Sequence, residues 1–239
     1  MEDSERLDRL FYELASESRL EILRVLQIEN LKMQEIARRL DLTATEAFRQ
    51  LERLSAAMLV RRQPEGSFAL TEFGKLELHF GVVMEFILKN KQFILTHDVW
   101  RLPSQFVNRI GELSQANLKM GLLESTTKSS QMIWEAKKYM WGISAEQLGQ
   151  PLDVIAKQIP EGVEYRILSP QVPAKLPNLE NRTLSDSPVI LALTEKEASI
   201  CFRFSDGRID YASFSGSDST FLNWVKDLFM YYWDRGSRA

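Results

Sequence analysis

Polar side chains that can form paired hydrogen bonds recur at helical spacing between residues 43 and 57. Arginine can donate two parallel hydrogen bonds to guanine, glutamine can pair in the same way with adenine, and threonine can contact a thymine methyl group or a phosphate. Glutamate can accept a hydrogen bond from cytosine. The members of this set are Thr45, Glu46, Arg49, Gln50 and Arg53. On one face of a helix they would suit the reading of base edges in the major groove of DNA, which admits one helix.

The same segment carries an apolar stripe that would anchor the helix. Its members are Phe48, Leu51, Leu54 and Met58. The polar set lies opposite this stripe, so we expect its side chains to point outward. Thr43 and Glu46 are expected to cap the start of the helix, and capping explains Glu46 at least as well as a base contact does. Any solvated helix shows polar residues opposite an apolar stripe, so the neighbouring elements must decide between the two interpretations.

A short β-hairpin is predicted directly after this helix. Residues 59–63 and 68–70 are strand-like, and the proline and glycine between them favour a turn. Arginines at the base of the hairpin would meet phosphates, and its turn would lie over the DNA backbone or minor groove. The residues expected to contact DNA are Thr43, Thr45, Glu46, Arg49, Gln50 and Arg53 on the helix and Arg61, Arg62, Gly66 and Ser67 on the hairpin.

The helices predicted before the hairpin, together with it, give the element order of a known fold. Apolar spacing predicts helices over 7–14 and 33–40, and a capping box formed by Ser18 and Glu21 predicts the start of another between them. Helices followed by a two-stranded hairpin within about 75 residues are typical of a winged helix-turn-helix, an α+β fold. Thr71 is expected to cap a long helix that continues to residue 96, whose apolar face extends beyond what a small domain can cover.

Charge and composition argue against some classes of protein. The net charge of the 239 residues is −3, which argues against a protein that coats nucleic acid nonspecifically. Residues 32–62 nevertheless carry seven basic and four acidic side chains, a local excess of three positive charges. No apolar run approaches the roughly 20 residues of a membrane span. A single cysteine, Cys201, and an acidic start without the pattern of a signal peptide lead us to expect a cytoplasmic protein.

Beyond about residue 125, helix-like and strand-like segments alternate, which predicts an α/β domain with a largely parallel sheet. The expected helices span 128–138, 147–158 and 221–233, and the expected strands span 139–143, 163–168, 189–193, 198–204 and 209–214. The last three strands are expected to be antiparallel, with a hairpin turn at Asp206 and Gly207. Residues 169–186 are expected to form a loop.

The parallel strands would place a small-molecule pocket beyond their carboxyl ends. Ser144 and Ser169 end the two strands and are candidate ligand contacts, with Trp141 as a stacking wall; a core tryptophan and capping serines are the simpler interpretations. His97 either caps the long helix or lines a crevice between domains. Cys201, inside a strand-like run, is expected to be a small buried apolar residue rather than a redox sensor.

Three segments resemble a known family. Residues 14–23 (LASESRLEIL) and 33–40 (MQEIARRL) resemble the opening of ArsR-type winged-helix repressors, and 70–75 (LTEFGK) resembles the segment that leaves the wing. Residues 93–113 are similar to archaeal transcriptional regulators with a methanogenesis-regulator-type domain. The resemblance implies a homodimer that binds a palindromic promoter element, and a C-terminal domain that senses an effector or partner.

The metal sites of that family are not expected here. Metal-sensing members use cysteine pairs in the helix before the reading helix, and residues 33–40 contain none. His79, near Glu77 and Glu85, is a weak echo of the family's other metal site, and a solvated histidine is the simpler interpretation. We therefore expect no metal and no cofactor.

The C-terminal part also resembles the phospholipase D-type fold, whose active members need a His-x-Lys motif. Neither His79 nor His97 is followed by x-Lys, and no glycine-rich phosphate loop or Gly-x-Ser-x-Gly elbow is present. We expect no enzyme, but a regulator with a DNA-binding domain over 1–75, a helical dimerisation region over 76–125 and an effector-sensing α/β domain over 126–239. A protein-interaction adaptor and, less favoured, a phosphodiesterase-like enzyme are the alternatives.

Overall fold

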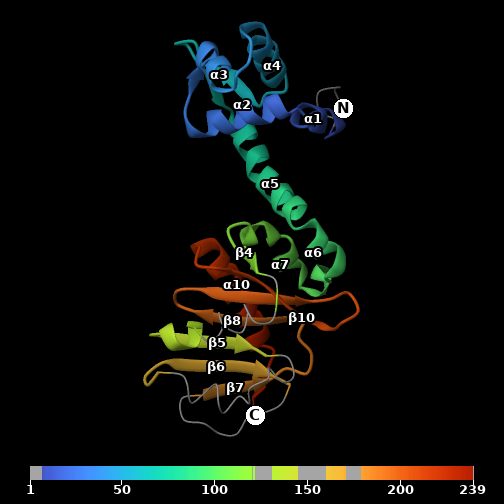
Figure 1. The fold of residues 1–239 in the computed structure, drawn as a ribbon, viewed down its shortest axis with the longest axis vertical. Coiled ribbons are helices and arrows are strands. Elements are labelled where there is room, and N and C mark those ends of the chain that lie inside the picture. Colours follow the sequence, from blue (N-terminus) through green and yellow to red (C-terminus); the bar gives the residue numbers. More distant parts are fainter. Residues whose placement is uncertain (1–6, 120, 122–130, 145–159, 171–178, 239) are drawn as a thin grey trace. The chain divides into compact units, whose positions relative to one another are not determined.

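The computed structural model describes residues 7–119, 121, 131–144, 160–170 and 179–238. The chain forms two compact units, residues 1–82 and 83–239 (Figure 1). None of the helices in the described ranges combines the length and the apolar character that a membrane crossing requires.

The first unit has the element order of a winged helix-turn-helix, as predicted. Its helices are α1 (Leu7–Leu14), α2 (Glu17–Ile28), α3 (Met33–Arg39), α4 (Ala44–Ala56) and the start of α5 (Glu72–Lys89). Its strands are β1 (Leu31–Lys32), β2 (Val60–Arg62) and β3 (Ser67–Leu70). They form an antiparallel sheet in the order β1-β3-β2, so the predicted hairpin gains a third strand that the sequence analysis missed.

Two helix starts can be compared with their predicted caps. Thr43 Oγ1 accepts a hydrogen bond from the Glu46 backbone N–H at 3.2 Å, which confirms the predicted cap of α4. The predicted capping box at Ser18 and Glu21 is wrong, because α2 begins at Glu17 after Ser16, and Glu21 instead pairs with Arg24 on the next turn. The core beneath these helices consists of Ile22, Leu23, Leu26, Leu31, Ile36, Leu51, Leu54, Leu59, Val60, Leu70 and Leu78.

The start of α5 is fixed against the end of α4. Thr71 Oγ1 accepts from the Gly74 N–H at 2.9 Å, as the predicted cap requires, and donates to the Met58 carbonyl at 2.6 Å. This brings Gly74 so close to β2 that a Cβ atom there would lie 2.1 Å from the Leu59 carbonyl oxygen. Glycine is therefore required by the close approach of two backbones.

We expect Gly74→Ala to lower the free energy of unfolding of the first unit by about 1–2 kcal/mol, since overpacking a tight site forces the backbone to shift. Hydrogen–deuterium exchange of α2 and α4 amides measures this loss. Gly81→Ala on the same helix is the matched control, because its Cβ would meet nothing within 4 Å. Equal protection in both variants would show that the contact at Gly74 does not constrain the fold.

The second unit contains a large sheet and the helices that precede and follow it. Its helices are the remainder of α5, α6 (Lys91–Thr96), η2 (Val99–Arg101), α7 (Ser104–Val107), η3 (Ile110–Leu113) and α10 (Ser219–Trp233). Its strands are β4 (Asn117–Lys119), β5 (Tyr139–Ile143), β6 (Glu164–Ser169), β7 (Leu179–Thr183), β8 (Val189–Thr194), β9 (Ala198–Arg203), β10 (Ile209–Gly216) and β11 (Ser237–Arg238). The single helix expected from 71 to 96 breaks at Asn90, whose side-chain N–H donates to the Phe86 carbonyl at 2.8 Å.

The sheet is mixed rather than largely parallel. Its order is β11-β7-β6-β5-β8-β9-β10-β4. Only β5, β6 and β7 run parallel to one another, while β8, β9, β10 and β4 are antiparallel, with Gly207 at a positive φ in the predicted hairpin turn. β7 lies inside the stretch predicted to be a loop. The helix predicted over 128–138 is described from 131 to 135, and the one over 147–158 lies outside the described residues.

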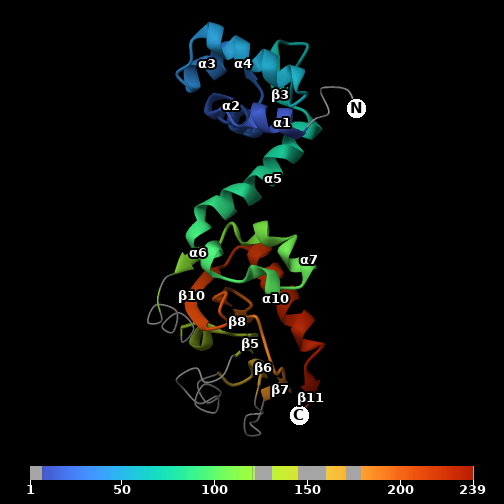
Figure 2. The same ribbon diagram turned by 90° about the vertical axis from the view of Figure 1, so that its right-hand side faces the viewer.

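Helix α10 covers one face of this sheet (Figure 2). Its buried side chains are Phe221, Trp224, Val225, Leu228, Phe229, Tyr232 and Trp233. Side chains from the segment that precedes the sheet, including Phe86, Phe93 and Phe106, belong to the same core. Much of the region expected to link two domains therefore packs as part of the second unit.

Cys201 lies in β9 and is buried, as predicted. Burial raises the pKa of its thiol to about 12, and the charge of Asp210 acts in the same direction. Because the thiolate is the reactive form, alkylation of the folded protein at pH 8 should be about a thousandfold slower than after unfolding in urea. Mass spectrometry after iodoacetamide treatment measures both rates; equally rapid labelling would contradict the burial.

Candidate nucleic-acid interface

The exposed face of α4 is rotated by about one residue relative to the predicted face. Phe48 and Met58, predicted to be buried, are 54% and 62% exposed. The buried positions of the helix are Ala47, Gln50, Leu51 and Leu54. The small side chain of Ala47 takes the inward position that was expected for Phe48, and this rotation of the helix turns Gln50 inward. The exposed side chains of α4 include Thr45, Phe48, Arg49 and Glu52.

Gln50 is held inside the first unit. Its Oε1 atom accepts a hydrogen bond of 3.0 Å from Arg19 Nη1. Arg19 is itself only 6% exposed, and its other nitrogens donate to the carbonyls of Glu13 and Tyr12, each at 2.7 Å. The prediction that Gln50 points outward is therefore wrong, because a buried arginine provides its hydrogen-bond partner.

Arg53 is also bound within the unit. Its Nε and Nη2 atoms donate to the two carboxylate oxygens of Glu13 at 3.0 and 2.6 Å, and its guanidinium lies 5.0 Å from the centre of the Tyr12 ring. The hydrogen bonds that Arg53 donates to the Glu13 carboxylate raise the pKa of Arg53. Glu13 also lies 3.1 Å from Arg19 Nε. We call the group of Glu13, Arg19, Gln50 and Arg53 the Glu13 clamp; it uses two of the side chains predicted to read bases.

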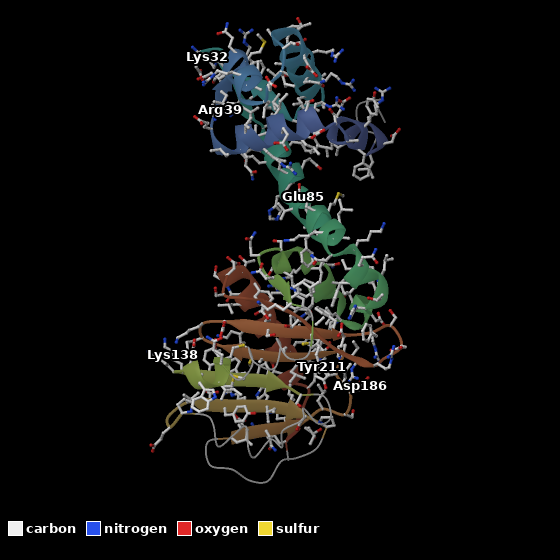
Figure 3. The ribbon with its side chains drawn as sticks, in the orientation of Figure 1. Lys32, Arg39, Glu85, Lys138, Asp186 and Tyr211 are labelled. Carbon is white, nitrogen blue, oxygen red and sulfur yellow. The ribbon has the colours of Figure 1, made fainter. Side chains whose placement is uncertain are left out.

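Arg49, Arg61 and Arg62 remain exposed. Within the part of the chain that the structure describes, none of the three has a carboxylate within 4.0 Å. Arg39, by contrast, pairs with Glu29 at 2.8 Å; Figure 3 shows it on the same unit as Lys32. The three arginines on α4 and β2 are thus available to an external anion.

The turn between β2 and β3 matches the predicted wing. Gly66 adopts a φ of 87°, which favours glycine, and a Cβ there would lie 3.9 Å from Arg62 Nη2, so the Arg62 side chain reaches the turn. Ser67 is buried, and its hydroxyl donates to Glu65 at 2.7 Å, which lowers the pKa of Glu65. The Ser67 hydroxyl, predicted to contact DNA, therefore forms its hydrogen bond within the hairpin.

Sequence analysis missed two side chains of this surface. Phe48 and Glu52 stand on the exposed face of α4 beside Arg49. An alternative stripe of Ala47, Leu51 and Leu54 also has helical spacing (i, i+4, i+7), and choosing it would have found both.

The residues predicted to contact a ligand in the second unit do not form a single site. Ser144 lines a cavity of about 240 Å³, whose other residues are Pro170, Leu184, Ser185, Asp186, Ser187, Arg203 and Ile209. Ser169 is buried beside Pro170. Trp141 packs in the core, stacked on Phe229 at 5.1 Å, and His97 forms the C-cap of α6, its Nε2 atom 2.9 Å from Asp210.

Over the ranges that the structure describes, no three His, Cys, Asp or Glu side chains are grouped in a way that could hold a metal ion. His79 is exposed on α5 and makes an edge contact with Phe80.

Comparison with known proteins finds similarity among solved structures. No protein-family model matches the chain, and no curated protein matches it. The structure of TrmBL2, described as an archaeal chromatin protein with a novel mode of DNA binding, aligns with 92% of this chain and 93% of its own at 17% sequence identity and a TM-score of 0.44.

Proposed function

We propose that the protein is a sequence-specific DNA-binding transcriptional regulator whose α4 helix enters the major groove. The observation that carries the proposal is the exposed Arg49, which stands on a helix anchored by Ala47, Leu51 and Leu54 and has no carboxylate partner among the described residues. Arg61 and Arg62 at the base of the wing would contact phosphates on the flanking backbone. Thr45 beside Arg49 can meet a thymine methyl group.

Selection of bound fragments from random DNA tests this proposal. A regulator enriches one sequence, and a dimer enriches two half-sites whose centres lie about 34 Å apart. Failure to enrich any sequence at low salt would reject the proposal. In the proposed regulator, the second unit senses a small molecule or partner that alters DNA affinity.

A dimer is proposed to form through α5. Apolar side chains on one stripe of this helix are each more than two-fifths exposed: Phe73, Leu76, Phe80, Met84 and Ile87. Solvent-exposed apolar stripes of this length mark protein interfaces. A symmetric pair of copies would cover the stripe and present two reading helices to DNA.

We expect the double substitution Leu76→Glu and Phe80→Glu to convert the dimer into a monomer, because it places two charges in an apolar interface. Sedimentation velocity measures the change, and Kd for the selected site should rise together with it. Val82→Glu is the matched control, since Val82 is 41% exposed on the other side of α5. A dimer that survives the double substitution would place the interface elsewhere.

Phe48 favours a second candidate, a protein-docking adaptor. An aromatic side chain that is 54% exposed in the centre of the α4 face is typical of protein interfaces, although phenylalanine also contacts thymine methyl groups. A salt titration separates the two functions. DNA affinity falls steeply with salt when phosphate contacts contribute, and an adaptor shows no DNA binding even at low salt.

A further inference from the structure

The cavity lined by Ser144 lies where parallel strands end. Ser144 follows β5, Pro170 follows β6, and residues 184–187 follow β7. Figure 3 shows Asp186 at the end of the sheet opposite Lys138, which precedes β5. Small molecules in open α/β sheets bind beyond the carboxyl ends of the parallel strands, and this cavity occupies that place.

Arg203 gives the cavity a positive charge that no carboxylate of the described residues neutralises. Its Nε atom donates to the Ser187 carbonyl at 2.8 Å and its Nη1 atom to the Gly207 carbonyl at 3.0 Å. No carboxylate of the described residues lies within 4.0 Å of Arg203, and Asp186 on the cavity wall is paired with Arg101 at 3.3 Å. Two carbonyls fix the guanidinium in place, and the described part of the chain supplies no carboxylate to pair with its charge.

A half-buried charge without a counter-ion is costly, and proteins normally pair it. Guanidinium groups bind carboxylate and phosphate oxygens through parallel hydrogen bonds, and two backbone contacts on Arg203 leave the rest of the fork for such a partner. The remaining lining offers the hydroxyl of the exposed Ser185 and the apolar surfaces of Leu184 and Ile209.

The volume limits the size of the ligand. The cavity has a volume of about 240 Å³, below the roughly 300–1,000 Å³ of pockets that hold drug-sized ligands. It therefore suits a compact molecule. We infer that this cavity binds a small organic anion, whose carboxylate or phosphate pairs with Arg203 and whose short hydroxylated or apolar body contacts Ser185 and Leu184.

The walls of the cavity are tied to the segment that follows α5 and α6. The Asp98 N–H donates to the Arg203 carbonyl at 3.1 Å, and the Ser205 N–H donates to the Thr96 carbonyl at 2.9 Å. The Arg101–Asp186 pair joins η2 to the cavity rim. An anion that moves Arg203 would therefore shift the end of α6, and this regulatory consequence rests on the proposed function.

Calorimetric titration of the full chain with three matched probes tests the site. Glycerol 3-phosphate and glycerate carry the two oxyanions on a three-carbon body, and glycerol is the neutral control. We expect saturable binding of at least one anion at one per chain and none of glycerol. The anion that binds with the lower Kd identifies the oxyanion that the site prefers. Binding of glycerol equal to that of both anions, or no saturable binding of either anion at millimolar concentration, would overturn the inference.

Two variants locate the binding. Arg203→Met should weaken anion binding by about tenfold to a hundredfold, since it removes a charged hydrogen-bond donor. Because Arg203 also supports two carbonyls, Ser185→Trp provides a second test: it fills the cavity from an exposed position and keeps the charge. Arg208→Gln is the control, because Arg208 is exposed and pairs with Asp206 in the nearby turn. Wild-type affinity in both cavity variants would overturn the assignment.

These titrations contain no DNA, so they distinguish the two proposals. Anion binding without any DNA binding would uphold the site and reject the regulator. A change in Kd for the selected DNA on adding the bound anion, absent in Ser185→Trp, supports the regulatory consequence; an unchanged Kd would overturn that consequence alone.

Discussion

Arg49→Ala is expected to weaken binding to the selected DNA site by about 1–3 kcal/mol, a factor of about 5 to 150 in Kd, and to relax the base preference at one position. Arg49 is the exposed arginine of α4 that the Glu13 clamp leaves free. Its guanidinium can donate two hydrogen bonds to a guanine, and alanine can donate none. Fluorescence anisotropy with the selected site and its single-base variants measures both effects.

Arg62→Ala is the matched comparison for Arg49→Ala, because Arg62 is expected to contact a phosphate and not a base. A phosphate contact carries no sequence information, so the variant should weaken all DNA sequences similarly and reduce the slope of log K against log salt by about one. Arg53→Ala, on the same helix as Arg49, should leave base preference unchanged, because Arg53 is bound to Glu13. Equal losses at Arg49 and Arg62 with unchanged preference would refute both assigned roles.

The elements that could be predicted are those whose signal is local. Thr43 caps α4 through a hydrogen bond to a residue three positions away, and the turn at Gly207 needs only its own positive φ. The run from Tyr139 to Ile143 is apolar enough to define β5 without its neighbours. Spacing, capping and turn chemistry were therefore sufficient to predict these particular elements.

The elements that could not be predicted depend on distant partners. Gln50 is buried because Arg19, 31 positions away, donates to it, and no local pattern marks that pair. β7 (LENRT) is a polar segment that becomes a strand only because β6 and β11 pair with its two edges. Likewise, the rule for strand ends identified Ser144, whereas Arg203 lies in an antiparallel strand, and its fixing carbonyls come from two separate loops.

Glu13→Ala is expected to lower the free energy of unfolding of the first unit by about 2–4 kcal/mol. Removing one partner of a buried ion pair leaves the other charge without compensation, and the partial exposure of Glu13 places the cost somewhat below that of a fully buried pair. The variant removes the carboxylate from Arg19, which is 6% exposed, and from Arg53 together. Hydrogen–deuterium exchange of α2 and α4 amides reports the loss.

The chain contains its own control for this measurement. All five tryptophans lie beyond residue 82, so tryptophan fluorescence reports the second unit, and its unfolding should not change. Glu21→Ala removes a surface carboxylate that pairs with Arg24 one turn away, and should change stability by less than about 1 kcal/mol. If Glu13→Ala behaves like Glu21→Ala, the Glu13 carboxylate does not hold Arg53 in place. Arg53 would then be free to turn toward DNA, and the reading face would again include it, as the helical pattern first indicated.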